Sequence, residues 1–246
     1  LNYKGKNLYA YEWIDGSTLY DHDSIQVWDQ FLNFAENNLW KVFETASESF
    51  NDLCKNFYYT KTFDRLELFL DRRDKSFAEK HIVNGSKVKS IYELLNQFNW
   101  EHLFEGIPTK LFHGDLQFDN VLYGNDQKFY LLDWRQDFAG SNVGDVYYDL
   151  SKMYGGIIMS YKLMKDENNF SCFVDGELVN YDYLTSNNLE LFQSKYEKWI
   201  LKNGYDLNKV KLITSLIFLN MAPLHEEVFG NLLFFKSKQM LQQIND

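Results

Sequence analysis

The chain has 246 residues, of which 45% are hydrophobic and 18% aromatic, so it is long enough to bury a substantial core. Its formal net charge of −10 argues against nucleic acid or an anionic membrane as the main partner. The two cysteines lack a CxxC spacing, no apolar run is long enough to span a bilayer, and no signal peptide opens the chain. These features favour a cytoplasmic protein with reduced thiols.

The first half of the chain is predicted to begin with a strand and to continue as helices. Residues 8–14 (LYAYEWI) have the aromatic and apolar character of a strand, and Asp15-Gly16 predicts a turn after it. Ser24 is the predicted N-cap of the first helix. Helical spacing of apolar residues predicts helices over residues 25–39, over parts of 53–77, and over 91–103.

The second half is predicted to be a small β region followed only by helices. A short strand is expected at residues 110–112, and residues 120–123 and 128–132 flank a Gly-Asn-Asp turn as a β-hairpin. Helices are then predicted over residues 145–161, 189–200, 210–219 and 229–244, the second of them capped by Asn203-Gly204. The order predicts a mainly helical α+β fold.

Three polar motifs gather around the predicted hairpin. His113-Gly114-Asp115 and Asn120 form an H-x-D-x-x-x-x-N pattern, and Asp133 ends the second strand. Gly144-Asp145 begins the following helix, where Asp149 is expected to be a structural residue. Phosphoryl transfer requires a carboxylate that accepts the proton of the attacking hydroxyl and oxygen ligands for Mg²⁺.

A rigid hairpin would bring the loop residue Asn120 and the strand-end residue Asp133 to one metal ion, with Asp115 as the base. The alternative for Asp115 and Asp133 is that they are ordinary turn and cap residues, which is common for aspartate. Their joint placement favours the functional interpretation.

The stretches HGDLQFDN, LLDW and GDVYYDL resemble the aminoglycoside phosphotransferase and choline kinase family, which has a protein-kinase-like fold. The resemblance implies that Asp115 is the catalytic base and that His113 holds the shape of its loop. It also implies that Asn120 and Asp133 bind Mg²⁺ and that Asp145 braces the catalytic loop from behind.

The N-terminal segment YEWIDG resembles the hinge that receives adenine in this family. The backbones of Glu12 and Ile14 would then bind the base, with Trp13 beside it. Residues 1–16 are expected to be the end of an N-terminal lobe and the hinge, and residues 17–246 the helical C-terminal lobe. The remainder of the N-terminal lobe has no counterpart here. Because Leu1 is not a natural start, a fragment that is inactive or nearly so by itself is expected.

The resemblance implies transfer of the γ-phosphate of ATP, or of GTP, to a hydroxyl of a small molecule. GDVYYDLSKMYGG and MAPLH resemble members from bacterial surface-polysaccharide loci, which implies a sugar or amino-alcohol acceptor rather than an antibiotic. Trp134, Arg135 and Asp137 are candidate acceptor-binding residues. Arg135 would bind an anionic group or pair with a surface carboxylate. Trp134 would stack on a sugar or a quaternary ammonium, or be buried.

Two other classes remain open. One is a catalytically inactive relative that binds a nucleotide or another ligand. The other is a metal-dependent hydrolase with His113 and Asp115 as ligands, which would need further His or Asp ligands that do not cluster in the sequence. The identity of the acceptor and the oligomeric state do not follow from the sequence.

Overall fold

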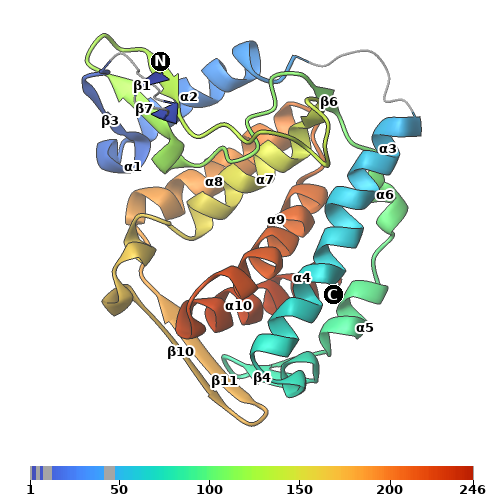
Figure 1. Ribbon diagram of the computed structural model, residues 1–246. Helices are drawn as coiled ribbons and strands as arrows, with labels where there is room; N and C mark the ends of the chain where they lie inside the picture. The colour runs from blue at the N-terminus through green and yellow to red at the C-terminus, as the bar shows by residue number, and fades with distance from the viewer. Residues whose placement is uncertain (1, 4–5, 8–12, 42–47, 246) are drawn as a thin grey trace.

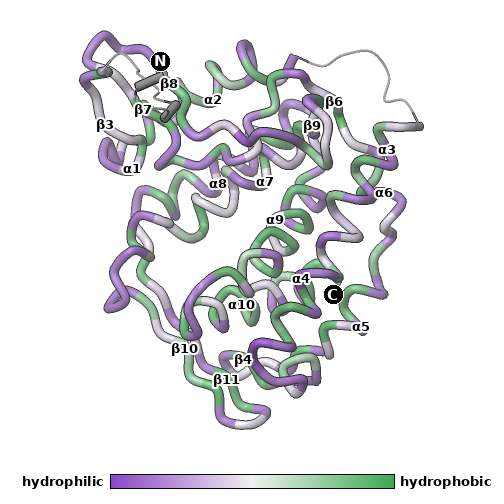
Figure 2. The backbone as a smooth tube through the Cα atoms, viewed as in Figure 1, coloured by the Kyte–Doolittle hydropathy of each residue, from purple (hydrophilic) through white to green (hydrophobic). Residues whose placement is uncertain are grey.

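Helix α9 (Leu207–Met221) is apolar on nearly every side, and it therefore lies at the centre of the molecule. It packs against α7 (Val146–Ile158), α10 (Glu227–Asn245) and α4 (Lys61–Arg72). Figure 1 shows this bundle, and the tube in Figure 2 is mainly hydrophobic along α9. The computed structural model describes residues 2–3, 6–7, 13–41 and 48–245.

The other helices lie around this bundle. Helix α8 packs against α7 and α9, and α3 joins the core through a π-helical turn, residues 56–60, that leads directly into α4. The bounds of these helices are α1 Leu19–His22, α2 Ile25–Asn38, α3 Glu48–Lys55, α5 Ile91–Asn96, α6 Trp100–Phe104 and α8 Asn187–Lys202.

The strands within the described residues form small sheets at the edges of the bundle. The orders are β1-β2, β3-β7-β8, β6-β9 and β10-β11-β4-β5, and every pair is antiparallel except β11 with β4. The bounds are β1 Asn2–Tyr3, β2 Lys6–Asn7, β3 Gly16–Thr18, β4 His81–Val83, β5 Ser86–Val88, β6 Pro108–Thr109, β7 Val121–Gly124, β8 Phe129–Leu131, β9 Gly144–Asp145, β10 Phe170–Asp175 and β11 Leu178–Tyr183.

The predicted mainly helical α+β class is confirmed, and so are the longer helices. The side chain of Ser24 caps α2 by accepting from the Val27 amide. Gly204 follows α8 with φ 78°, a backbone conformation that glycine adopts without a steric penalty. The hairpin predicted around Gly124 is formed by β7 and β8. No helix within the described ranges is long and apolar enough to cross a membrane.

Two local predictions were wrong in their bounds. Residues 110–112 form a turn and an irregular segment, because the short strand of this region is β6, two residues earlier. Residues 91–103 form two helices instead of one. The first, α5, begins with a capping box between Ser90 and Glu93, and Asn99 occupies the N-cap position of the second, α6, without a side-chain hydrogen bond.

The four-stranded sheet β10-β11-β4-β5 is where the prediction of a helical second half failed. Along β10, half-buried and exposed residues alternate, which is the period of a strand with one covered face. Asp175 ends β10, and Gly176 turns the chain with φ 56°. The sequence signal for this hairpin was the pair Asp175-Gly176 between two segments in which more buried and exposed residues alternate.

The predicted strand over residues 8–14 falls mostly on residues 8–12, which lie outside the described residues. Trp13 and Ile14 have no regular structure, and Gly16, predicted as a turn residue, begins β3. Strand β3 pairs with β7 and so lies directly beside the hairpin that ends near Asp133.

Candidate active site

The loop between β6 and β7 is organised by hydrogen bonds among its own residues. The Asp115 amide donates to His113 Nδ1 at 3.2 Å. Asn120 Nδ2 donates to the Asp115 carbonyl at 2.9 Å and to Asp115 Oδ2 at 3.2 Å. These contacts bring together the three loop residues that the sequence singled out, and they orient one carboxylate oxygen of Asp115.

His113 is a buried, neutral member of this loop. Burial lowers the pKa of His113 to about 4, although the nearby Asp115 charge opposes the shift. The ring of Trp134 lies over the imidazole at 4.8 Å between centroids. Because its Nδ1 accepts from the Asp115 amide, His113 positions the backbone and does not itself face an open space.

The brace predicted for Asp145 is made by Asp149 instead. Asp149 accepts from the amides of His113 at 3.0 Å and Gly114 at 2.7 Å. Burial raises the pKa of Asp149 to about 7, and the two loop amides oppose that rise. The carboxylate lies one helical turn beyond the start of α7, which is the turn that faces the loop.

Asp145 has a different structural role. Its side chain caps α7 by accepting from the Tyr147 amide at 3.1 Å, and it also accepts from the Ile107 amide at 2.9 Å and from the Tyr58 hydroxyl at 2.8 Å. The residue is completely buried. Asp145 therefore fixes α7 to the segment before the loop, and its side-chain hydrogen bonds go to Tyr58, Ile107 and Tyr147 and not to the loop itself.

Asp133 reaches the same region from the end of the hairpin. The Leu132 amide donates to the Asn120 carbonyl at 2.9 Å, so the residue before Asp133 is tied to the last residue of the loop. Asp133 has φ 54°, a left-handed conformation that is uncommon outside glycine and is found more often at functional sites. Its exposed side chain lines one cavity with Asp115.

Asn120 and Asp133 are the predicted ligands of a magnesium ion, and both carry oxygen atoms that can serve this purpose. The Asn120 amide nitrogen is engaged by the Asp115 carbonyl and carboxylate, which leaves the amide oxygen for another partner. Carboxylate and amide oxygens are the ligands that Mg²⁺ prefers. Within the described part of the chain, no group of three or more His, Cys, Asp or Glu side chains is arranged to hold a metal ion.

The cavity at this site has a volume of about 310 Å³ and is rich in cations. Its charged lining residues are two carboxylates and four cations, contributed by α4, the loop between β6 and β7, the segment after β8, and α7. They are Lys61, Arg65, Asp115, Asp133, Arg135 and Lys152. Apolar lining comes from Ile217, Met221 and Leu224.

Lys152 lines the cavity, but it was not predicted from the sequence motifs. Its ammonium forms an ion pair with Asp115 Oδ1 at 2.7 Å, and only 10% of the lysine side chain is exposed. The available signal was its position in α7, because residues 145, 149 and 152 follow the i, i+4, i+7 spacing of one helix face. Lys61 and Arg65 were also missed, since α4 is far from the motifs in sequence.

Of the predicted acceptor residues, only Arg135 lines this cavity. Its amide donates to the His113 carbonyl at 2.8 Å, and its side chain packs over Gly114, where a Cβ atom would lie 2.4 Å from Arg135 Cβ. Trp134 is 43% exposed and contacts His113, so the predicted burial was wrong. Asp137 accepts from the Gly140 amide at 2.8 Å.

The predicted hinge is described only in part. Glu12 lies outside the described residues. Trp13 is 88% exposed, and Ile14 is half-buried before β3. Both precede the strand that pairs with β7, so the segment lies on the hairpin side of the catalytic loop.

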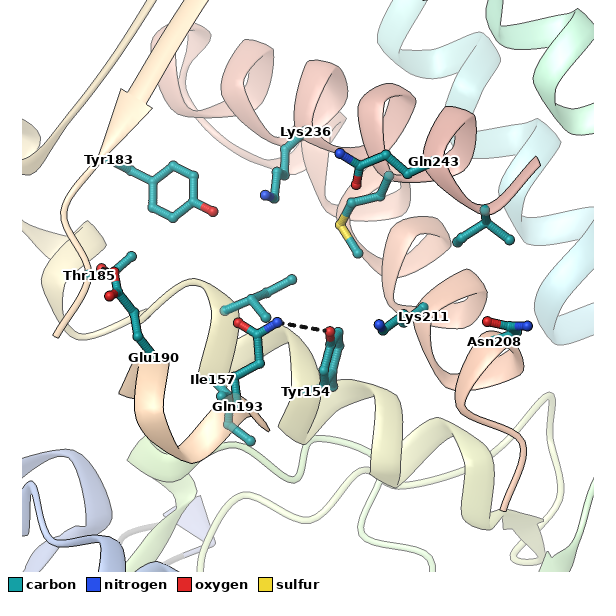
Figure 3. A pocket seen from close by; sticks show the side chains of 13 residues that line it. Tyr154, Ile157, Tyr183, Thr185, Glu190, Gln193, Asn208, Lys211, Lys236 and Gln243 are labelled. Atoms are coloured by element: carbon teal, nitrogen blue, oxygen red, sulfur yellow. Dashed lines mark hydrogen bonds between the residues drawn. The ribbon is translucent and has the colours of Figure 1, made fainter. Parts of the chain in front are cut away.

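A larger cavity, of about 570 Å³, lies on the opposite face of α7 (Figure 3). Two of its polar lining residues, Tyr154 and Lys211, are paired with Glu197 beside the cavity. The Tyr154 hydroxyl donates to Glu197 at 2.6 Å and accepts from Gln193 at 3.2 Å, and Lys211 forms an ion pair with Glu197 at 3.0 Å. None of the residues predicted for catalysis lines this cavity.

Comparison with known proteins finds no family model, no curated protein and no solved structure that matches this chain. The site is therefore interpreted from its own contacts and from its motifs.

Proposed function

We propose that this protein is the helical lobe of a protein-kinase-like phosphotransferase related to the aminoglycoside phosphotransferases and choline kinases. It transfers the γ-phosphate of ATP, or of GTP, to a hydroxyl group of a small molecule. The observation that supports this most is the convergence of Asp115 and Asp133 on one cavity, with the loop of Asp115 hydrogen-bonded to Asn120 and Asp149.

In this proposal Asp115 accepts the proton of the attacking hydroxyl. Its Oδ1 is paired with Lys152 and its Oδ2 with Asn120, so the carboxylate has a fixed orientation. The side chain is 39% exposed, so a hydroxyl can reach it. Lys152 stabilises the negative charge of Asp115 and lies where it can also stabilise charge on the transferred group.

Asn120 and Asp133 would hold the magnesium ion through an amide oxygen and a carboxylate. Bound there, Mg²⁺ would bridge the nucleotide phosphates and neutralise the charge that develops on them during transfer. Trp13 and Ile14 lie beside the β3-β7-β8 sheet, which supports entry of the nucleotide from that side. A sugar or amino alcohol from surface-polysaccharide metabolism remains the proposed kind of acceptor, refined below.

The test is a screen for nucleotide consumption by the product of the complete coding sequence. Sugars, amino alcohols, aminoglycosides and hydroxy acids are offered with Mg·ATP or Mg·GTP, and each reaction is compared with a blank that lacks the alcohol. Alcohol-dependent release of nucleoside diphosphate, with one phosphate gained by the alcohol, supports the proposal. Nucleotide binding without transfer to any alcohol would favour the inactive relative, and hydrolysis that needs a transition metal would favour the hydrolase.

A further inference from the structure

The cavity beside Asp115 contains cations that have no carboxylate partner among the described residues. Lys61 and Arg65 lie one helical turn apart on α4, and Arg135 approaches from the segment after β8. None of the three forms an ion pair with the described residues, whereas the fourth cation, Lys152, is already paired with Asp115. A cluster of unpaired positive charge facing a cavity is a binding site for an anionic group.

Lys61 differs in this respect from the other enclosed lysines of the protein. Lys209 Nζ donates to the carbonyls of His102 and Glu105, each at 2.8 Å. Lys238 Nζ donates to the carbonyl groups of Phe77 and Glu79. The ammonium of Lys61 makes no such hydrogen bond within the described chain, and it lies over the rings of Phe57 and Tyr148.

Two of the three unpaired cations share one aromatic ring. Lys61 Nζ lies 4.3 Å from the centroid of Phe57, and the guanidinium carbon of Arg135 lies 5.1 Å from the same centroid. Phe57 belongs to the π-helical turn that directly precedes Lys61, and such turns are frequent at functional sites. The ring holds two like charges close together, an arrangement that an anion between them would stabilise.

The position of the cations separates them from the expected nucleotide entrance. In Figure 1, helices α7 and α9 lie between α4 on one side and strands β3 and β7 on the other. Trp13 and Ile14 directly precede β3, which pairs with β7. Asp133, the proposed metal ligand, belongs to the hairpin side of the cavity, while Lys61 and Arg65 form its α4 wall. Lys61 and Arg65 therefore lie across the cavity from the hairpin, and Arg135 extends the cationic surface from the segment that contains Asp133.

We propose that the acceptor alcohol has an oxyanion group, a carboxylate or a phosphate, which binds between Lys61, Arg65 and Arg135 while its hydroxyl faces Asp115. The apolar side chains of Ile217 and Met221 cover the carbon skeleton between these two ends. This inference rests on the proposed function and specifies its acceptor as an anionic alcohol, such as a hydroxy acid or a sugar phosphate.

The first part of the test is direct binding, without turnover. Glycerol 3-phosphate, glucuronate and inorganic phosphate are titrated calorimetrically into the wild-type protein and into the double variant Lys61→Met/Arg65→Gln. The matched control is Lys198→Met/Lys202→Gln, which removes two exposed cations of α8 outside the cavity. The inference is supported if the oxyanions bind to the wild type and the control and if their affinity for the cavity variant is about 10- to 100-fold lower. Equal binding by all three proteins, or none, overturns it.

The second part is transfer to matched pairs of alcohols that differ by one anionic group, namely glycerol with glycerol 3-phosphate and glucose with glucuronate. The anionic member should have the higher kcat/KM, and the cavity variant should raise its KM about 10- to 100-fold while leaving the Kd of Mg·ATP unchanged. A preference for the neutral members overturns the inference and leaves the phosphotransferase proposal standing.

Two further outcomes separate the possible failures. If the cavity variant weakens ATP but not ADP, the cations bind the γ-phosphate of the nucleotide, and the inference is wrong. If oxyanions bind through Lys61 and Arg65 but no alcohol is phosphorylated, the anion site stands as a binding site and the proposed function fails.

Discussion

Helix α7 separates two cavities, and their charged side chains differ in whether they already have partners. On one face, Tyr154 and Lys211 converge on Glu197 in a closed network of hydrogen bonds and one ion pair. On the other face, Asp133, Lys61 and Arg65 form no hydrogen bond or ion pair through their side chains within the described residues, and Lys61 lies over the ring of Phe57. The larger cavity has one such charged residue, Lys236, which lies near the ring of Tyr183.

The difference teaches that volume is a poor guide to the reactive site in this protein. Buried polar groups are normally paired, so groups that remain unpaired around a cavity need an explanation such as a ligand. The smaller cavity has such groups on two of its walls, α4 and the segment after β8, and it also contains the left-handed backbone of Asp133. The comparison can be sharpened by changing equivalent residues on the two faces.

The largest expected contrast between the two cavities comes from a matched pair of lysines on the two sides of α7. Lys152→Met removes the partner of Asp115 and should lower kcat about 10- to 100-fold, because the charge on the base and on the transferred group loses its stabilisation. Lys211→Met removes the partner of Glu197 in the other cavity and should change kcat by less than about twofold. Steady-state kinetics of both variants measures the contrast; equal losses would mean that the two cavities do not differ in function.

A smaller effect is expected from Asp149→Asn, which places an amide where two loop amides donate. One donor then faces an NH₂ group, so we expect a loss of about 1–3 kcal/mol in the free energy of unfolding and a lower kcat through the displaced loop. Urea unfolding at pH 7 measures the free energy of unfolding, and steady-state kinetics measures kcat. The control is Asp182→Asn, at an exposed position of β11, which should change neither quantity.

The smallest expected effect is a pH dependence of oxyanion binding. Burial and, to a smaller extent, the neighbouring charges of Arg135, Arg65 and Lys152 together lower the pKa of Lys61 to about 7. An anion in the cavity stabilises the charged form and raises that pKa, so binding requires proton uptake above about pH 7. Affinity should therefore fall up to about tenfold per pH unit as the pH rises from 7 to 9.

Calorimetry of inorganic phosphate over this range, together with Lys61→Met, checks that expectation. The carboxylates of Asp115 and Asp133 and the Tyr148 hydroxyl also line the cavity, and they remain in the variant. A pH dependence that survives in Lys61→Met would contradict the assignment of the effect to Lys61.

The comparison also explains what the sequence could predict. The loop of His113, Asp115 and Asn120 and the hairpin that ends near Asp133 are local in the chain, so spacing alone predicted them. The longer helices were predicted for the same reason. As expected, Ser24 caps the start of α2, and Gly204 follows the end of α8. These features depend on short-range periodicity and capping.

The parts that were missed depend on contacts between distant segments. Lys61 and Arg65 reach the site only because α4 packs on α9, and nothing in their local sequence indicates that contact. The exchange of roles between Asp145 and Asp149 depends on which turn of α7 faces the loop. The parallel pairing of β11 with β4 joins strands about a hundred residues apart, beyond the reach of local patterns.

The most direct test of the central claim is the binding of Mg·ATP to two variants of the cavity carboxylates, measured beside turnover. We predict that Asp115→Asn binds Mg·ATP as the wild type does and loses about 10²- to 10⁴-fold in kcat, because only the proton acceptor is removed. Asp133→Ala should lose both turnover and the magnesium dependence of nucleotide binding. Magnesium-dependent binding that is unchanged in Asp133→Ala, or turnover that is unchanged in Asp115→Asn, would contradict the assignment of this cavity as the site of phosphoryl transfer.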